Sequence, residues 1–244
     1  MKILAIESSG MTAGCALEED GTLIGDYNIQ LKKTHSQTLV PMINELKTVT
    51  ELDLHTLDAI AVTKGPGSFT GLRIGAATAK GMGLALEKPI IPISTLESLA
   101  FNLYGVDALI CPLMDAKRGQ VFTGIYTEQD TSICLKEPCC VKAEEILKEL
   151  NERGKDVIFV GDGVDPFHSL VESILTVPHR YAPSHLSLQR AASTAILAEQ
   201  KYEEQKEAVF VSSDAFRPVY LRVSSAEQQR KEKELQKKNE EGNT

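Results

Sequence analysis

Two acidic residues at the ends of apolar segments could act together on a phosphate group. Glu7 and Asp115 each follow an apolar run, and small or polar residues come next in both places. Two carboxylates that face each other across a cleft can orient Mg²⁺ or an attacking hydroxyl group. Ser8 and Thr12, in the turn after Glu7, would complete such a nucleotide cleft. The alternative is that each acid caps its own turn by accepting backbone N–H groups.

A second candidate for anion binding is the segment 65–71, which reads Gly-Pro-Gly-Ser-Phe-Thr-Gly. It lies between a predicted strand and a predicted helix, where free amides and the positive helix end can receive an anion. It is not a P-loop, because no Gly-Lys-Ser/Thr follows, and its glycines lack the Gly-x-Gly-x-x-Gly spacing. A tight turn with Ser68 or Thr70 as the helix N-cap is the alternative.

Signals for a metal site or a nucleophile are poor. The five histidines show no His-x-x-x-His spacing, and the serines at 8 and 9 lack a Gly-x-Ser-x-Gly context. The sequence therefore predicts no catalytic residue, no metal site and no cofactor.

The elements that would position these residues alternate between strands and helices, and the pattern restarts halfway along the chain. The strand that ends at Asp115 repeats the one that ends at Glu7 about 108 residues later, and in both places a second strand begins six residues on. We predict an α/β fold made by duplication, with domains at 1–105 and 106–222. The predicted strands are 2–7, 13–17, 22–29, 57–63, 108–114, a segment from 121, and 157–160; the predicted helices surround Leu39 and cover 70–86, 143–153, 166–175 and 187–199.

The first two predicted helices have less polar surface than helices that cover one face of a sheet normally have. Small residues also recur every four positions along the second helix, which leaves a stripe that another backbone can approach closely. We predict a partner interface here, which two copies could form as a four-helix bundle across a twofold axis. Internal packing is the alternative. The predicted interface residues are Leu39, Ile43 and Leu46 in the first helix, and Gly71, Gly75, Ala79 and Gly83 in the second.

Composition narrows the possible classes of protein. The chain has 244 residues, a net charge of −8 and no Trp, which argues against a nucleic-acid binder that acts alone. Five cysteines without a Cys-x-x-Cys pair favour a reducing, cytoplasmic compartment, and no signal or membrane segment is apparent. Residues 223–244 carry too little apolar surface to join a core, so we predict a disordered tail or a frayed helix there, with a partner-binding appendage as the alternative.

Several strings resemble the TsaB (YeaZ) family, and the resemblance spans residues 1 to about 222. The segment 65–75 is the most specific of them. The matching strings are Ile3-Leu4-Ala5-Ile6-Glu7-Ser8-Ser9, His35-Ser36 with Leu39 and Pro41, Gly65-Pro66-Gly67-Ser68-Phe69-Thr70-Gly71-Leu72-Arg73-Ile74-Gly75, Met114-Asp115-Ala116-Lys117-Arg118-Gly119, and Pro218-Val219-Tyr220-Leu221-Arg222.

The resemblance implies two duplicated domains of the actin-like ATPase (ASKHA) superfamily, each with βββαβα topology. It also implies a role in making N6-threonylcarbamoyladenosine at tRNA position 37, as the non-catalytic partner of TsaD. The ATPase TsaE would be a further partner, the chain would form a homodimer when alone, and tRNA would bind only through the complex. TsaD binds its metal with a His-x-x-x-His pair, whereas here Leu39 follows His35 by four residues. Asp162 stands where related ATPases hold adenosine, which argues against ATP binding.

Two other functions are compatible with parts of the sequence. Glu7 and Asp115 across a cleft would suit a nucleotide-dependent phosphotransferase. A glycopeptidase is an older interpretation of the wider family, but the sequence shows neither the metal pair nor a triad that it would need.

Overall fold

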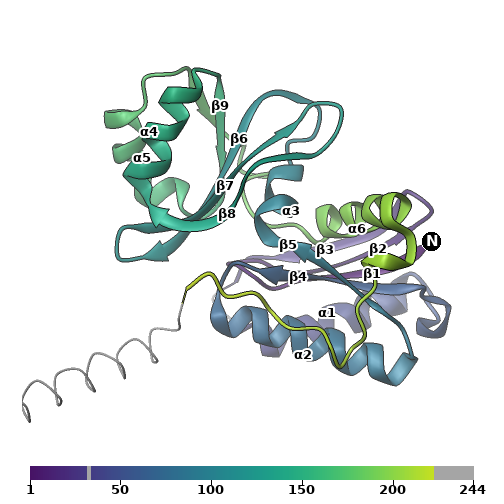
Figure 1. Ribbon diagram of the computed structural model, residues 1–244. Coiled ribbons are helices and arrows are strands. Elements are labelled where there is room, and N and C mark those ends of the chain that lie inside the picture. The colour runs from purple at the N-terminus through teal and green to yellow at the C-terminus, as the bar shows by residue number, and fades with distance from the viewer. Residues whose placement is uncertain (32–33, 223–244) are drawn as a thin grey trace, which may run out of the picture.

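The computed structural model describes residues 1–31 and 34–222, which form two mixed β-sheets flanked by helices (Figure 1). The first half of the chain contains β1 (Lys2–Glu7), β2 (Ala13–Glu19), β3 (Thr22–Ile29), α1 (His35–Val49), η1 (Leu54–Thr56), β4 (Ala59–Gly65), α2 (Phe69–Leu86), β5 (Ile90–Ser94) and α3 (Thr95–Phe101). The second half contains β6 (Val106–Lys117), β7 (Gln120–Glu128), β8 (Ile133–Lys142), α4 (Ala143–Arg153), β9 (Val157–Val160), α5 (Val164–Ile174), β10 (His179–Tyr181), α6 (Ala191–Gln205) and η2 (Lys206–Val209).

The two sheets have the same strand order. The first runs β3-β2-β1-β4-β5, and the second, taken from its β8 edge, runs β8-β7-β6-β9-β10. In each sheet the first strand of its half lies in the centre, antiparallel to the second strand and parallel to the fourth. This repetition confirms the predicted fold class, a duplicated α/β fold of the actin-like type.

The central strands have continuous apolar segments, 3–6 in β1 and 108–114 in β6, because both of their faces are covered. In β1, Leu4 and Ile6 pack on the side of α1 and α2, whereas Ile3 and Ala5 pack on the side of α6. Side chains alternate between the two faces of a strand, so two covered faces give a continuous apolar run.

The two halves exchange their third helices. α1 and α2 cover one face of the first sheet, and the other face is covered by α6, which comes from the second half (Figure 1). In return α3, from the first half, packs with the second sheet, where Leu96 and Leu99 share a core with Ile110 and Tyr126. We call the first sheet with α1, α2 and α6 the first lobe, and the second sheet with α3, α4 and α5 the second lobe.

This exchange bears on the predicted domain boundary near Gly105. The strands do change sheet there, but two cores mix residues from both sides of the boundary: the one between the first sheet and α6, and the one between α3 and the second sheet. The core between the second sheet and α4 and α5 is built from residues after the boundary alone. The division into 1–105 and 106–222 stays a prediction, and residues 223–244, predicted to be a tail, lie outside the described residues.

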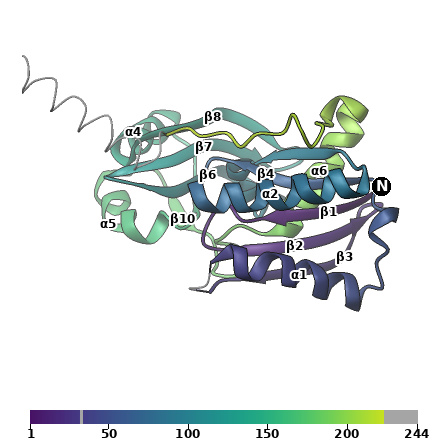
Figure 2. The same ribbon diagram turned by 90° about the horizontal axis from the view of Figure 1, so that it is seen from below.

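A strap, defined as Phe210–Arg222, runs from α6 back across the first lobe and ends on the second (Figures 1 and 2). Phe216 is buried in the first core, and the Val219 N–H donates to the Lys64 carbonyl at 2.6 Å. Arg222 then donates to the carbonyl of Ala116 in the second lobe. The strap therefore ties the two lobes together.

Among the residues that the structure describes, no helix is long and apolar enough to cross a membrane.

Candidate functional site

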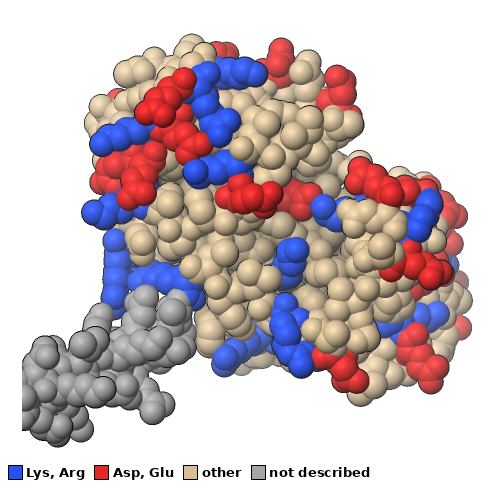
Figure 3. All heavy atoms as spheres, viewed as in Figure 1, with Lys and Arg blue, Asp and Glu red and all other residues tan. Residues whose placement is uncertain are grey.

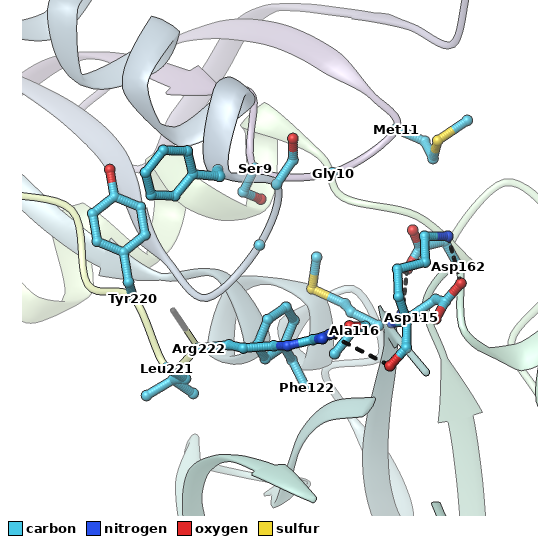
Figure 4. Close-up of a pocket in the computed structure, with 15 residues that line it drawn as sticks. Ser9, Gly10, Met11, Asp115, Ala116, Phe122, Asp162, Tyr220, Leu221 and Arg222 are labelled. Carbon is cyan, nitrogen blue, oxygen red and sulfur yellow. Dashed lines mark hydrogen bonds and ion pairs between the residues drawn. The ribbon is translucent and has the colours of Figure 1, made fainter. Parts of the chain in front are cut away.

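A cavity of about 310 Å³ lies between the two lobes (Figure 4). Its lining comes from the turn after β1, the loop before α2, the β6–β7 hairpin, the turn after β9 and the end of the strap. The lining residues are Ser9, Gly10, Met11, Gly67, Ser68, Phe69, Met114, Asp115, Ala116, Lys117, Phe122, Asp162, Tyr220, Leu221 and Arg222. We call it the cleft cavity.

Of the four residues predicted for a nucleotide cleft, only Asp115 lines the cleft cavity. Glu7 is fully buried beneath the turn that follows it, and the Ser8 hydroxyl donates to the Gly71 carbonyl at 2.9 Å. Thr12 is buried and borders a different hollow beside Gln189. The expectation that Glu7 and Asp115 face each other across the cleft is therefore wrong, because the turn after β1 folds over Glu7.

Both acids bind their own turns. The N–H and the hydroxyl of Ser9 donate to Glu7 Oε1 at 2.6 and 2.5 Å. Asp115 accepts from the Lys117 N–H at 2.7 Å and pairs with its ammonium group at 2.6 Å. These contacts match the turn-capping alternative.

Asp162, which the sequence places after β9, lies in the cleft cavity beside Asp115 (Figure 4). It accepts the Asp115 backbone N–H at 3.3 Å, and burial raises the pKa of its carboxyl. Lys117 and Arg222 also line the cavity. Figure 3 shows Lys and Arg atoms gathered on one side of the molecule, at the left of the view. The cavity thus combines acidic groups with a basic border, so it is not a uniformly positive phosphate site.

The glycine-rich loop before α2 is closed by contacts within the chain. Ser68 is the N-cap of α2 and accepts the Gly71 N–H at 3.2 Å, whereas its own N–H donates to the Ser9 carbonyl at 2.7 Å. Gly67 is so close to the Ser9 carbonyl that a side chain would collide with it. The loop therefore holds the turn after β1, and two of its amides, those of Ser68 and Gly71, are already bonded within the chain.

The end of the strap completes the cavity. Tyr220 packs against Phe69 with 4.7 Å between ring centroids and the rings tilted by 39°, and the Arg73 guanidinium lies 3.9 Å from the Phe69 ring centroid. In the sequence, the string 218–222 stands out only as part of the family resemblance. Phe69 and Tyr220 lie 151 positions apart in the chain, so no local sequence pattern could predict that they are in contact.

The predicted interface residues lie inside the chain. Leu39, Ile43 and Leu46 belong to the first core, and at most 6% of any of these residues is exposed. The stripe of small residues on α2 faces inward as well: Gly71 and Gly75 meet Ser8, Ala79 is in the core, and Gly83 meets Ser213 and Lys88. These seven residues are therefore core, in agreement with the internal-packing alternative, and a partner would meet the opposite faces of the two helices.

The outward face of α2 is nevertheless apolar. Its exposed residues are Thr70, Arg73, Ala77, Gly81, Leu84 and Ala85. Leu84 is 69% exposed, and on α1 Val40 is 58% exposed. The other exposed residues of α1 are mostly polar, among them Asn44 and Glu45. We call the six exposed residues of α2 together with Val40 of α1 the α1–α2 face.

His35, the first residue of α1, bonds the turn after β1. Its Nε2 lies 2.9 Å from the Gly10 carbonyl oxygen, and Leu39, one turn later, is buried in the core. Within residues 1–31 and 34–222, no three His, Cys, Asp or Glu side chains lie close enough together to hold a metal ion.

Wild type is expected to lose stability as the pH rises because of the buried carboxyl of Glu7, and replacing Glu7 with glutamine is expected to remove this loss. Burial raises the pKa of the Glu7 carboxyl to about 7. The folded chain then holds more protons than the unfolded chain between the two pKa values, so the free energy of unfolding falls as pH rises through this window. For one carboxyl the slope is at most about 1.4 kcal/mol per pH unit.

The test is urea unfolding of wild type and Glu7→Gln at about pH 5 and about pH 8. At each pH, the quantity compared is the difference in the free energy of unfolding between the two proteins. Glutamine keeps the shape and an acceptor oxygen for Ser9, and the variant is expected to gain relative stability at the higher pH. Glu18 and Glu128, whose pKa values burial also raises, titrate in both proteins and cancel. An equal difference at both pH values would contradict the prediction.

Comparison with known proteins identifies relatives over nearly the whole chain. A family model described as TsaD, tRNA N6-adenosine threonylcarbamoyltransferase, matches residues 29–230. The chain is 35% identical over 228 residues to the tRNA threonylcarbamoyladenosine biosynthesis protein TsaB of Bacillus subtilis (strain 168), covering 93% of this chain and 96% of the relative. It is 29% identical over 231 residues to TsaB of Escherichia coli (strain K12), with the same coverage.

Two solved structures are similar to this chain over most of its length. YeaZ from Pseudomonas aeruginosa is 26% identical, with a TM-score of 0.76 over 90% of this chain and 99% of that chain. A second Pseudomonas aeruginosa structure, described as similar to peptidase YEAZ, gives a TM-score of 0.78 at 26% identity over 91% of this chain and 99% of that chain.

Fold and site together define a class: a duplicated actin-like α/β chain whose strand-end acids bind their own turns instead of facing a common ligand. Within this class, the chain belongs to the TsaB family of tRNA threonylcarbamoyladenosine biosynthesis proteins. The family is generally a non-catalytic component of the machinery that makes this modified nucleoside. The family predicted from the sequence motifs is thus confirmed.

Proposed function

We propose that this chain is a non-catalytic subunit that binds and activates TsaD, with TsaE as a further partner and tRNA bound only by the complex. The main support for the proposal is the low polarity of the α1–α2 face. Of the six exposed residues of α2, only Thr70 and Arg73 are polar. Since the solvent side of a helix is normally polar, an apolar outward face indicates a surface that is covered in use.

The same face would serve two partners. A homodimer of the isolated chain would pair the α1–α2 face with itself, as a twofold interface requires. TsaD, related to this chain through the same family model, would present an equivalent face and replace one copy. The buried positions proposed from sequence, such as Gly75 and Ile43, support the face from inside.

The proposal predicts that Ala77→Glu abolishes association and leaves the fold intact. Ala77 is exposed in the middle of α2, and glutamate is a good helix former, so the new charge changes the surface and not the core. Sedimentation velocity, alone and with purified TsaD, measures the result. Ser169→Glu, an exposed position on α5 of the second lobe, is the matched control and should associate like wild type. Unchanged association of Ala77→Glu would refute the interface.

An omission assay tests the function itself. Purified TsaD, TsaE, threonylcarbamoyl-adenylate synthase, ATP, threonine, bicarbonate and unmodified tRNA are combined with and without this chain, and modified adenosine is scored by mass spectrometry. We expect modification to require the chain and to survive Glu7→Gln and Asp115→Asn, because both acids bind their own turns. Equal modification without the chain would refute the function, and loss of activity in either variant would refute the non-catalytic role.

The phosphotransferase alternative loses its main support because Glu7 does not reach the cleft cavity. Calorimetry with Mg-ATP separates the two functions. We expect no tight binding, since Asp162 and Asp115 would face the nucleotide. Tight binding that weakens in Asp115→Asn would favour the phosphotransferase.

We also propose that the protein works in the cytoplasm. All five cysteines are free thiols, as is usual where thiols are kept reduced.

A further inference from the structure

A second cavity, of about 280 Å³, lies between the lobes and is separate from the cleft cavity apart from Leu221 of the strap, which lines both. On one side are the carboxyl ends of the parallel strands β4 and β5, with Lys64 and Ser94. On the other side are β7 and β8 of the second sheet, with Tyr126 and Glu137. Ligands of open α/β sheets bind just outside the carboxyl ends of parallel strands, which is the position of this cavity. We call it the Tyr126 pocket.

Two buried hydroxyl groups in the pocket wall, those of Tyr126 and Ser94, form no hydrogen bond of good geometry within the described residues. The Ser94 hydroxyl is close enough to Tyr126 to donate to its oxygen, which leaves the Tyr126 O–H without an acceptor. Only 1% of Tyr126 is exposed. Burying such a group without a partner costs free energy, and most buried hydroxyls in proteins are paired. Burial also raises the pKa of the Tyr126 hydroxyl, which therefore stays protonated and able to donate.

The charged groups of the pocket carry both signs. Lys64 makes no ion pair or side-chain hydrogen bond in the part of the chain that the structure describes, although it borders the cavity. Lys201 is paired with Glu97 at 2.7 Å, and Glu137 adds a second carboxylate. A cation with no partner and two hydroxyls suit a carboxylate, whereas the acidic side chains suit an ammonium group.

We propose that the Tyr126 pocket binds a small zwitterion, a free α-amino acid. Its carboxylate is placed against Lys64 and the hydroxyls of Ser94 and Tyr126, and its ammonium group lies toward Glu97 and Glu137. The volume is at the small end for ligand pockets, which favours a molecule smaller than a nucleotide. The proposal is independent of the partner role proposed above, because the pocket is formed by residues of this chain alone.

Isothermal titration calorimetry on the full chain tests the proposal with four probes: L-threonine, L-alanine, L-lactate and inorganic phosphate. Lactate keeps the carboxylate of alanine but replaces its ammonium group with a hydroxyl. We expect saturable binding of at least one amino acid, and weaker or no binding of lactate and phosphate. Absence of saturable amino-acid binding would overturn the proposal, as would binding of lactate or phosphate as tight as that of the amino acid.

Two variants locate the binding site. Tyr126→Phe removes the buried hydroxyl and keeps the ring, and Lys64→Met removes the charge and keeps the length. Each is expected to weaken amino-acid binding about tenfold or more, since a lost hydrogen bond to a charged group has about this effect. Tyr181→Phe and Lys155→Met, outside the pocket, are the matched controls and should bind like wild type.

A thermal melt of each protein supplies an independent readout. The amino acid is expected to raise the Tm of wild type and of both controls but not of the pocket variants, whose melts without ligand also show that they fold. Wild-type affinity and an equal Tm increase in the pocket variants would overturn the proposal.

Discussion

Replacing Gly75 with leucine is expected to destabilise the folded chain strongly, whereas the same replacement at Gly81 leaves its stability unchanged or slightly higher. The two glycines lie six positions apart on α2 but face opposite environments. A Cβ atom at Gly75 would collide with the Ser8 hydroxyl and touch Val62, whereas one at Gly81 would meet nothing within 4 Å. Overpacking at Gly75 is expected to cost about 3 kcal/mol or more, and removal of a mid-helix glycine at 81 to gain up to about 1 kcal/mol.

Urea unfolding of the two variants and wild type measures both effects with the same side chain. A Gly75→Leu protein that is as stable as wild type but no longer associates would contradict the core assignment. It would support the prediction that the stripe of small residues is an interface. Gly81 belongs to the α1–α2 face, so its leucine variant can change association without any loss of stability. Sedimentation of the folded variant separates the two effects.

Cutting the chain at the predicted domain boundary is expected to produce two fragments that fold only together. Residues 1–105 would lack α6, which covers Ile3 and Ala5 on one face of the first sheet. Residues 106–244 would lack α3, whose Leu96 and Leu99 fill the core beside the second sheet. Each uncovered face exposes several large aliphatic side chains. Burial of one such side chain stabilises the folded state by about 1.5–3 kcal/mol. That loss is a large part of the stability of an ordinary domain.

Circular dichroism and size-exclusion chromatography of the fragments, produced separately and together, test this expectation. Separately, each fragment is expected to aggregate or to lack cooperative unfolding; together they are expected to form a stable one-to-one complex. Residues 1–222 are the control and should fold, since all the elements named above are retained. A 1–105 fragment with a cooperative transition of its own would show that the exchanged helices are dispensable.

Elements with strong local signals could be predicted from the sequence. The helix at 143–153 and the strand at 157–160 coincide with α4 and β9, because an amphipathic pattern and a short buried run identify them. β5 was missed because Pro92 interrupts its run, although proline is tolerated in a strand at the sheet edge. β8 was missed for a similar reason: it is a half-exposed edge strand that contains Pro138 and pairs irregularly.

The candidate site was harder to predict, because a pattern shows that residues share a face but not which way the face points. The stripe from Gly71 to Gly83 shares one side of α2, and only the fold shows that this side meets Ser8 and the sheet. Glu7 likewise ends a strand as predicted. Its burial depends on the contact between Ser9 and the loop at Ser68, about sixty positions away, which local spacing cannot reveal.

The exchanged helices also affect the order in which the chain becomes foldable during synthesis. The last strand of the first sheet ends at Ser94, but the helix that covers its second face is complete only at Gln205, 205 − 94 = 111 residues later. At about 5–20 residues per second, the ribosome needs roughly 6–22 s to make this stretch. During that interval the apolar face around Ile3 and Ala5 has no cover from its own chain. A nascent chain that stalls before Arg190 is therefore a substrate for proteases and for chaperones that bind exposed apolar segments, although every strand of its first sheet has already been made.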